Sequence, residues 1–197
     1  MQQSWRQDPD KLTFIICLPT TNSNSNSTLT SDNADSPSRM VGDINLFLRI
    51  DDGDDGASTT PQIIGEIELM IAEKTNQRKG FGRAALLSFL RYIIDHEAEI
   101  LREFVHGDSS ASASLLSPAG GGAGSPSWKF ACLSVKIGQA NVRSLALFES
   151  VGFEKVALEP NYFGEFELRR VQLGVGAVDA ALERAAVRNY TVLSYGR

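Results

Sequence analysis

Cysteine, histidine and long apolar runs are scarce in this sequence, and each shortage argues against a class of protein. The 197 residues include two cysteines and two histidines, and neither histidine lies at ligand spacing from a cysteine, so we expect no metal site. Cys17 and Cys132 lie in the apolar runs TFIICLP and KFACLSV, which favours two buried thiols over a disulfide. No apolar run is long enough to span a bilayer, and the N-terminal MQQSWRQDPDK lacks the apolar stretch of a signal peptide. We therefore expect no membrane partner and a cytoplasmic location, with the nucleus as the alternative.

Positive charge is also in short supply, because the formal net charge at pH 7 is -5. A nucleic-acid-binding domain normally carries a basic face, so we expect no nucleic-acid partner. Any positive patch must be local, and Gln77-Arg78-Lys79 is the candidate. The composition leaves the oligomeric state open.

Two low-complexity segments interrupt the chain. Residues 20–38 are rich in Asn and Ser, and residues 107–127 are rich in Ser, Gly and Ala. Neither buries enough apolar surface to offset its ordering entropy, so we expect two mobile loops. The segments beside them are too short to fold alone. The sequence thus predicts one domain over 1–173 with these two loops, and a tail over 174–197 that can form a helix.

The periodicity of apolar residues changes along the rest of the chain. Alternation or short apolar runs predict strands at 12–18, 40–50, 64–73, 128–137 and 163–173. Apolar residues three or four apart predict one helix from Gly82 to just before Gly107. A second helix is predicted over 140–153, with Asn141 at its N-cap and Gly152 just past its end. This order predicts an α/β fold of the α+β type, a mixed and mostly antiparallel sheet flanked by helices.

The stretch NQRKGFGRAALLSFL at 76–90 has a glycine-broken, basic loop that opens a helix. Gly80-Phe81-Gly82-Arg83-Ala84-Ala85 matches the dinucleotide pattern G-x-G-x-x-A, but the glycine does not directly follow the strand and the acids at the right distance lie inside the helix. A helix start that offers free N–H groups and nearby positive charge attracts an anion. On these residues alone, a phosphate cradle and a plain basic turn both remain open.

A second segment decides between those two interpretations. Residues 140–153, ANVRSLALFESVGF, match N-x-x-[SA]-x-x-[LF]-[YF]-x-x-x-G-F; alone, this is a capped amphipathic helix. Together with the strand, the Gln-x-x-Gly-x-Gly loop at 77–82 and its helix, it resembles the GNAT superfamily of N-acetyltransferases. The chain also contains the segments MVGDINLFL, GEIELMIAE, RKGFG and KIGQAN. These segments are similar to those of N-acetyltransferase 9-like proteins, close to the ribosomal-protein alanine acetyltransferase branch. The resemblance runs from about Met1 to Leu173.

The resemblance implies an acyltransferase that uses acetyl-coenzyme A as its cosubstrate, without a metal. The acetyl group would move to an amine of a protein or peptide by direct attack in a ternary complex. The pyrophosphate would lie on the loop 77–82, the pantetheine amides would pair with backbone near residues 70–72, and an N–H of residue 70 or 71 would polarise the thioester carbonyl. The expected cofactor contacts are Met70, Ile71, Gln77, Arg78, Lys79, Gly80, Phe81, Gly82, Arg83 and Asn141.

The attacking amine must lose a proton, and Glu66 and Glu68 are the carboxylates nearest the expected thioester. Alternation alone fits equally well with two solvent-facing strand residues. We favour Glu66 as the base, because several family members use a carboxylate on this strand.

Two features depart from the family pattern. The family fold begins with a strand and two helices that shape the acceptor side, and we expect this chain to be shortened and to start after them. Where many members place a tyrosine that acts as general acid, this sequence has Phe148, which has no hydroxyl. The alternative function is therefore a coenzyme-A-binding interaction protein with weak or no catalysis.

Overall fold

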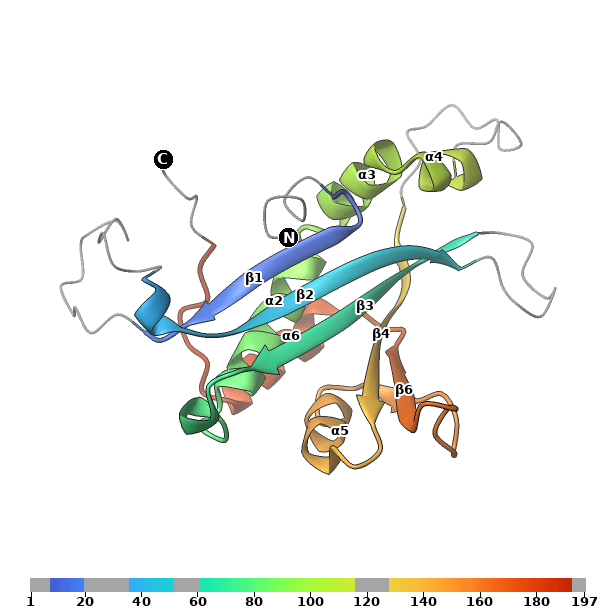
Figure 1. Cartoon of the computed structure of the whole chain (residues 1–197). Coiled ribbons are helices and arrows are strands. Elements are labelled where there is room, and N and C mark those ends of the chain that lie inside the picture. Colours follow the sequence, from blue (N-terminus) through green and yellow to red (C-terminus); the bar gives the residue numbers. More distant parts are fainter. Residues whose placement is uncertain (1–7, 20–35, 52–60, 116–127, 193–197) are drawn as a thin grey trace.

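The computed structural model describes residues 8–19, 36–51, 61–115 and 128–192. Its centre is one six-stranded sheet in the order β1-β2-β3-β4-β6-β5 (Figure 1). All neighbouring strands are antiparallel except β3 and β4, so the predicted mixed sheet flanked by helices is confirmed. The strands are β1 Lys11–Cys17, β2 Met40–Asp51, β3 Gln62–Ile71, β4 Phe130–Gly138, β5 Glu154–Lys155 and β6 Glu165–Arg170; the helices are α2 Phe81–Asp95, α3 Glu97–Gly107, α4 Ser109–Leu115, α5 Val142–Glu149 and α6 Val175–Arg184, with 3-10 turns η1 Pro37–Arg39 and η2 Lys74–Asn76.

The first three strands separate an apolar face from a polar one. Leu46 is paired with Leu12 on one side and with Ile67 on the other, and both Leu46 and Ile67 are buried in the core. One residue along, Asn45 is paired with Thr13 and Glu68. Because side chains alternate along a strand, the polar residues share the face opposite the core. This register determines which acids can lie beside one another.

Helices α2 and α6 cover the apolar face of β1, β2 and β3 (Figure 1). Leu86, Leu90 and Ile93 recur three or four residues apart in α2, and all three are fully buried, as the helical period predicts. From α6, Val178 and Leu182 reach the same core, and Asp179 forms an ion pair with Arg91 of α2. The helix at 175–184 is therefore packed on the sheet domain.

The prediction of a single helix from Gly82 to just before Gly107 is wrong, because the chain forms two helices that meet at His96. His96 has φ -116° and ψ 16°, outside the helical region. Its N–H donates to Tyr92 and its carbonyl accepts from Ile100, so one residue both ends α2 and starts α3. The sequence gives no glycine or proline at this point, and so the break has no local signal.

The prediction of a loop over 107–127 is wrong at its start, because α4 forms there. Asp108 caps this helix, since its Oδ1 accepts the N–H groups of Ser110 and Ala111, both at 2.8 Å. Ala111 is fully buried, which fixes the turn against the core. Residues 116–127, like most of the other expected loop (20–35), lie outside the described residues.

The strand expected at 163–173 is shorter, because a turn built on Asn161 precedes it. The Oδ1 atom of Asn161 accepts the N–H groups of Phe163 and Glu165, both at 2.9 Å, and Gly164 has φ 74°. Glycine adopts this left-handed conformation at no steric cost. The strand β6 therefore begins at Glu165, and it pairs with β4 and with the short β5.

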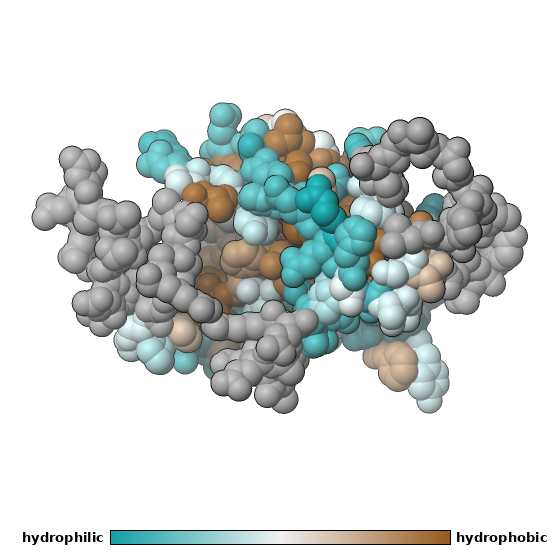
Figure 2. All heavy atoms as spheres, turned by 90° about the horizontal axis from the view of Figure 1, so that it is seen from above, coloured by the Kyte–Doolittle hydropathy of each residue, from teal (hydrophilic) through white to brown (hydrophobic). Residues whose placement is uncertain are grey.

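Both cysteines are free thiols, with Cys132 buried and Cys17 half-buried. No helix among the described residues is long and apolar enough to cross a membrane. Seen from above, hydrophilic side chains form a band across the surface and apolar side chains show beside it (Figure 2).

Candidate active site

Strands β3 and β4 pair in parallel over their first residues and then separate. Their register runs from Ile63 with Phe130 to Glu66 with Ser134. Beyond that pair, β3 continues to Ile71 beside β2, and β4 continues to Gly138 beside β6. We call the diverging parts, residues 67–71 and 135–138, the fork, and the Glu66–Ser134 pair its apex (Figure 1). A strand edge without a ladder partner can receive an extended ligand as an added strand.

The basic loop at 77–82 lies just past the end of β3. Its first residue is tied back to the strand, because Gln77 Nε2 donates to the carbonyl of Ile71 at 2.8 Å. Arg78 and Gly80 both have positive φ, 64° and 89°. Gln77, Arg78, Lys79 and Gly80 are all exposed. The loop thus presents backbone and positive charge to solvent at the fork.

Gly82 marks the place where α2 begins against both β3 and α5. A Cβ placed on Gly82 would lie 3.8 Å from Ile71 Cγ1 and 4.0 Å from Leu147 Cδ2. Next to it, a Cβ on Gly80 would meet nothing within 4 Å. These are ordinary contacts or open space, so packing does not require glycine here. The open surface beside the first turn of α2 is the kind of place where a phosphate can approach backbone N–H groups. Phe81 is half-buried and Arg83 is exposed.

The N-terminus of α5 provides a second helix start near the fork. Asn141 is its N-cap as predicted, since its Oδ1 accepts the N–H of Ser144 at 3.2 Å. A surface hollow lined by Ala140, Asn141, Val142 and Arg143 lies at this point. The amide nitrogen of Asn141 is on the exposed side of a capped helix, so it can donate to a ligand without loss of the cap.

The two candidate acids differ in their surroundings, although they share the polar face of β3. Glu68 is exposed. The Glu66 side chain is 18% exposed, and its Oε2 lies 2.9 Å from Nζ of Lys136 on β4. Glu66 therefore stands at the apex with one oxygen bound to an ammonium, an ion pair that the sequence did not indicate.

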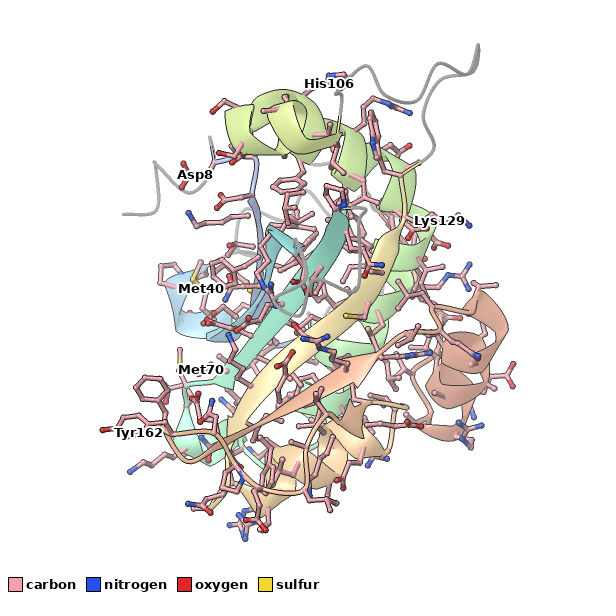
Figure 3. All side chains as sticks on the ribbon, turned by 90° about the vertical axis from the view of Figure 1, so that its right-hand side faces the viewer. Asp8, Met40, Met70, His106, Lys129 and Tyr162 are labelled. Carbon is pink, nitrogen blue, oxygen red and sulfur yellow. The ribbon has the colours of Figure 1, made fainter. Side chains whose placement is uncertain are left out.

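The backbone expected to meet the pantetheine is only partly available. The N–H of Ala72 donates to the carbonyl of Val41 at 2.8 Å, so the expected pairing at Ala72 is wrong. Hydrogen-bonding directions alternate along an antiparallel strand, so the N–H of Met70, the partner of Asp43, also points toward β2, and Ile71 is the residue whose N–H points into the fork. Met70 points to the polar face and is 54% exposed. Met70 and Tyr162 lie toward the same end of the molecule, on the side away from α2 and α6 (Figure 3).

Phe148 lies inside the core rather than in the fork. It is 3% exposed and its ring packs edge-on against Phe153, with centroids 5.1 Å apart. A tyrosine ring at position 148 would be buried in the same way. The position therefore supplies packing in this chain.

Three polar residues at the apex or within two residues of it along the strands escaped sequence reasoning. Lys136 binds Glu66, while Ser134 Oγ and Asn45 Oδ1 are buried without a hydrogen-bond partner. An unpaired buried polar atom costs about 1–3 kcal/mol, so each of these two atoms calls for an explanation. Two residues before the apex on β4, burial raises the pKa of the Cys132 thiol. Within the described ranges, no group of three or more His, Cys, Asp or Glu side chains could hold a metal ion.

Sequence comparison finds relatives that carry one family name. The chain is 32% identical over 192 residues to an N-acetyltransferase 9-like protein of Schizosaccharomyces pombe, an alignment that covers 85% of this chain and 73% of the relative. It is 31% identical over 169 residues to the human alpha/beta-tubulin-N-acetyltransferase 9, covering 86% of this chain and 59% of that protein. No family model matches. A solved structure of Arabidopsis thaliana NAA60 with a bisubstrate analogue aligns with a TM-score of 0.45 and 11% identity, over 83% of this chain and 77% of that one.

Proposed function

The chain belongs to the family of N-acetyltransferase 9-like proteins, and from that premise we propose that it transfers the acetyl group of acetyl-coenzyme A to an amine of a protein or peptide. The observation that carries the proposal is the fork of β3 and β4, with two helix starts beside it. A cosubstrate whose extended, amide-bearing arm leads into a pyrophosphate suits such a combination of strand edge and anion-attracting N–H groups.

The loop 77–82 and the start of α2 would hold the pyrophosphate. The exposed Arg78 and Lys79 supply positive charge, and the helix start supplies N–H groups. Asn141 would donate from its amide nitrogen, since its oxygen already caps α5. The edge of β3 at Ile71 would pair with the amide-bearing arm of the cosubstrate.

The chemical step is an attack by the free amine nitrogen on the thioester carbonyl carbon. A C–N bond forms, the C–S bond breaks, and the sulfur leaves with the bonding electron pair. The N–H of Ile71 would stabilise the charge that develops on the carbonyl oxygen. Glu66 would take the proton that the amine loses, directly or through water. Lys136 occupies Oε2, so Oε1 is the oxygen assigned to this proton.

The acceptor is proposed to be a protein or peptide, and the cytoplasm is proposed as the location. The names of the human and Drosophila melanogaster relatives specify tubulin, which supports a protein amine as the class of acceptor. The chain spans 59% and 39% of those two proteins. Tubulin itself is therefore a candidate acceptor for this chain, to be tested beside other peptides.

A second candidate function is coenzyme A binding without efficient transfer. Two observations favour it: Lys136 holds one oxygen of the proposed base, and the buried Phe148 supplies no hydroxyl for the leaving sulfur. The two functions share the cosubstrate and differ only in turnover.

The test measures coenzyme A binding and acetyl transfer separately. Titration calorimetry of the full chain with coenzyme A should give a Kd of about 1–10 µM, roughly -7 to -8 kcal/mol. Mass spectrometry should then detect acetylated peptide after incubation with acetyl-coenzyme A and peptides that carry a free N-terminus. Binding without any acetylated product would leave the second candidate function. The absence of binding heat at high ligand concentration would remove both.

A further inference from the structure

A lysine amine of the chain itself lies beside the proposed base. Lys136 is on β4, two residues past Ser134, in one of the two diverging parts of the fork. Its Nζ donates a hydrogen bond to Oε2 of Glu66 at 2.9 Å. The Lys136 side chain is 43% exposed, so the ammonium is held at the apex without being enclosed. Apart from the thioester, an amine and a carboxylate within hydrogen-bond reach are the groups that acetyl transfer requires.

The charged side chains that face Lys136 come from the strands on both sides of it. On β6, Glu167 is the direct partner of Lys136, and its Oε1 accepts from Nε of Arg169 at 2.6 Å. On β3, Glu68 is two residues beyond Glu66 on the same face and is exposed. Among the described residues, Glu66 is the acid that forms an ion pair with Lys136. Because Arg169 engages Glu167, Glu66 is the carboxylate placed to take a proton from Lys136.

Lys155 has a similar environment in a different part of the sheet. Its Nζ lies 3.5 Å from Oε1 of Glu149, and its side chain is 37% exposed. It is on β5, the edge strand beyond β6. The two lysines therefore agree in exposure and in having one acidic partner, and they differ in their distance from the fork along the sheet. This makes Lys155 the matched comparison for any reaction that depends on the fork.

The chemistry at Lys136 has the same steps as transfer to any other amine. Glu66 takes one proton from Nζ, and the neutral Nζ attacks the carbonyl carbon of an acetyl thioester. A C–N bond forms, the C–S bond breaks, and the thiolate leaves with the bonding electron pair. The nitrogen then gives its second proton to the thiolate, and the proton on Glu66 passes to solvent. The products are an acetamide on Lys136 and a free thiol.

We propose that Lys136 is a self-acetylation site, at which the chain transfers the acetyl group of its own bound acetyl-coenzyme A to Nζ with Glu66 as the base. The inference rests on the proposed acetyl transfer and adds an acceptor that belongs to the chain itself. Acetylation removes the positive charge of Lys136 and with it the ion pair. Oε2 of Glu66 then becomes available to the next amine, so the modification releases the proposed base.

The first measurement is timed peptide mapping by mass spectrometry. The full chain is incubated with acetyl-coenzyme A that carries an isotopically labelled acetyl group. Label should appear on Lys136 at least about ten-fold faster than on Lys155, because only Lys136 is held beside the reacting groups. The rate constant should stay the same when the chain is diluted, since the step is intramolecular. It should rise with pH, because the neutral amine is the form that attacks.

Glu66→Gln tests the base in the same assay. This variant should slow the labelling of Lys136 by about 100-fold, within the range for general base catalysis, and should leave the labelling of Lys155 unchanged. The map of each chain before incubation records any acetyl group acquired during expression. An unlabelled acetyl group on Lys136 that is absent from Glu66→Gln supports the inference in the same way.

The second measurement needs no acetyl transfer. An amine-reactive reagent is added to the chain with and without saturating coenzyme A. Bound coenzyme A should slow the modification of Lys136 by about five-fold or more, because a bound ligand loses most of its contact with solvent and covers its neighbours. Modification of Lys155 should stay unchanged. If coenzyme A binds by calorimetry and gives Lys136 no protection, the amine is not beside the thiol end of the cosubstrate and the inference is overturned.

The release of Glu66 is measured with a peptide acceptor. Incubation of the wild type with acetyl-coenzyme A before the peptide is added should raise turnover about three-fold or more, because the carboxylate has lost its cationic partner. Lys136→Arg keeps the charge and has no lysine amine, so its turnover should not rise. Lys155→Arg is the control and should behave as the wild type. Equal turnover before and after acetylation of Lys136 would overturn the release of the base.

The remaining outcomes separate this inference from the proposed function. If a peptide is acetylated and Lys136 stays unmodified, the transfer stands and self-acetylation fails. Equal labelling of Lys136 and Lys155 that Glu66→Gln does not slow would identify uncatalysed acetylation by the thioester, which also overturns the inference. A rate constant that rises with chain concentration would assign the step to a second molecule and overturn the intramolecular step. Absence of coenzyme A binding would remove the proposed function itself.

Discussion

The two sides of the fork hold their polar groups in different ways. On the proposed cofactor side, the loop 77–82 and the starts of α2 and α5 present backbone N–H groups and exposed basic side chains. On the side of the proposed base, which we call the proposed acceptor side, the face of Asn45, Glu66, Glu68, Ser134 and Lys136 presents side chains from three strands. The first side depends on the local conformation of the chain. The second depends on the register of strands that are far apart in sequence, so changes to the two sides should have separable effects.

The largest expected effect is on the proposed cofactor side, at Gly82. A Cβ there meets its nearest neighbour at 3.8 Å, so Gly82→Val should leave the fold intact while its methyl groups occupy the space beside the helix start. Coenzyme A affinity should fall by at least about 100-fold, roughly 2.7 kcal/mol, as measured by titration calorimetry. Gly80→Val should act in the same direction, with additional strain because Gly80 has φ 89°.

Gly174→Val is the control for these glycine changes. Gly174 is the N-cap of α6 with φ -69° and a Cβ there meets nothing within 4 Å. Valine is a poorer N-cap than glycine, so the melting temperature should fall slightly while coenzyme A affinity stays unchanged. Unchanged coenzyme A affinity in Gly82→Val would mean that the loop is not the pyrophosphate site.

The second largest expected effect is a loss of turnover at Glu66, and it distinguishes the proposed acceptor side from the proposed cofactor side. Glu66→Gln keeps the shape of the side chain and removes the proposed base, so turnover should fall by about 100-fold or more, within the usual range for general base catalysis. Coenzyme A affinity should not change, because the Glu66 side chain is not among the proposed cofactor contacts. Stopped assays of acetylated peptide and calorimetry measure the two quantities independently.

Glu68→Gln is the matched change on the same strand face. Glu68 is exposed and lies past the apex, so its loss should reduce turnover by less than ten-fold. Equal losses in the two variants would assign the effect to overall charge and not to a specific base.

The two sides were also unequally visible in the sequence. The loop 77–82, the Asn141 cap and the alternation around Glu66 are local patterns, so the sequence predicted them together with the mixed sheet. The break at His96 carries no glycine or proline signal, and the Ser/Ala composition of 109–115 hid a helix that Asp108 caps. Lys136 and Ser134 became neighbours of Glu66 only through the β3–β4 register, which no single stretch of the sequence specifies.

The smallest expected effect concerns the paired strands directly behind the proposed acceptor side. Cys132 is the partner of Ile64, two residues before the apex, and it is 4% exposed. Burial raises the pKa of its thiol, and the thiolate is the form that reacts. Near pH 8 the native protein should therefore react with a disulfide reagent at Cys17 first, about ten-fold faster than at Cys132. The Cys132 rate should keep rising as the pH increases past the range of an ordinary thiol, because deprotonation occurs later. Peptide mapping after timed labelling measures both rates, and Cys17→Ser isolates the slow site. Fast labelling of Cys132 would show that β3 and β4 open behind Ser134, and the proposed acceptor side would then be as mobile as an exposed loop.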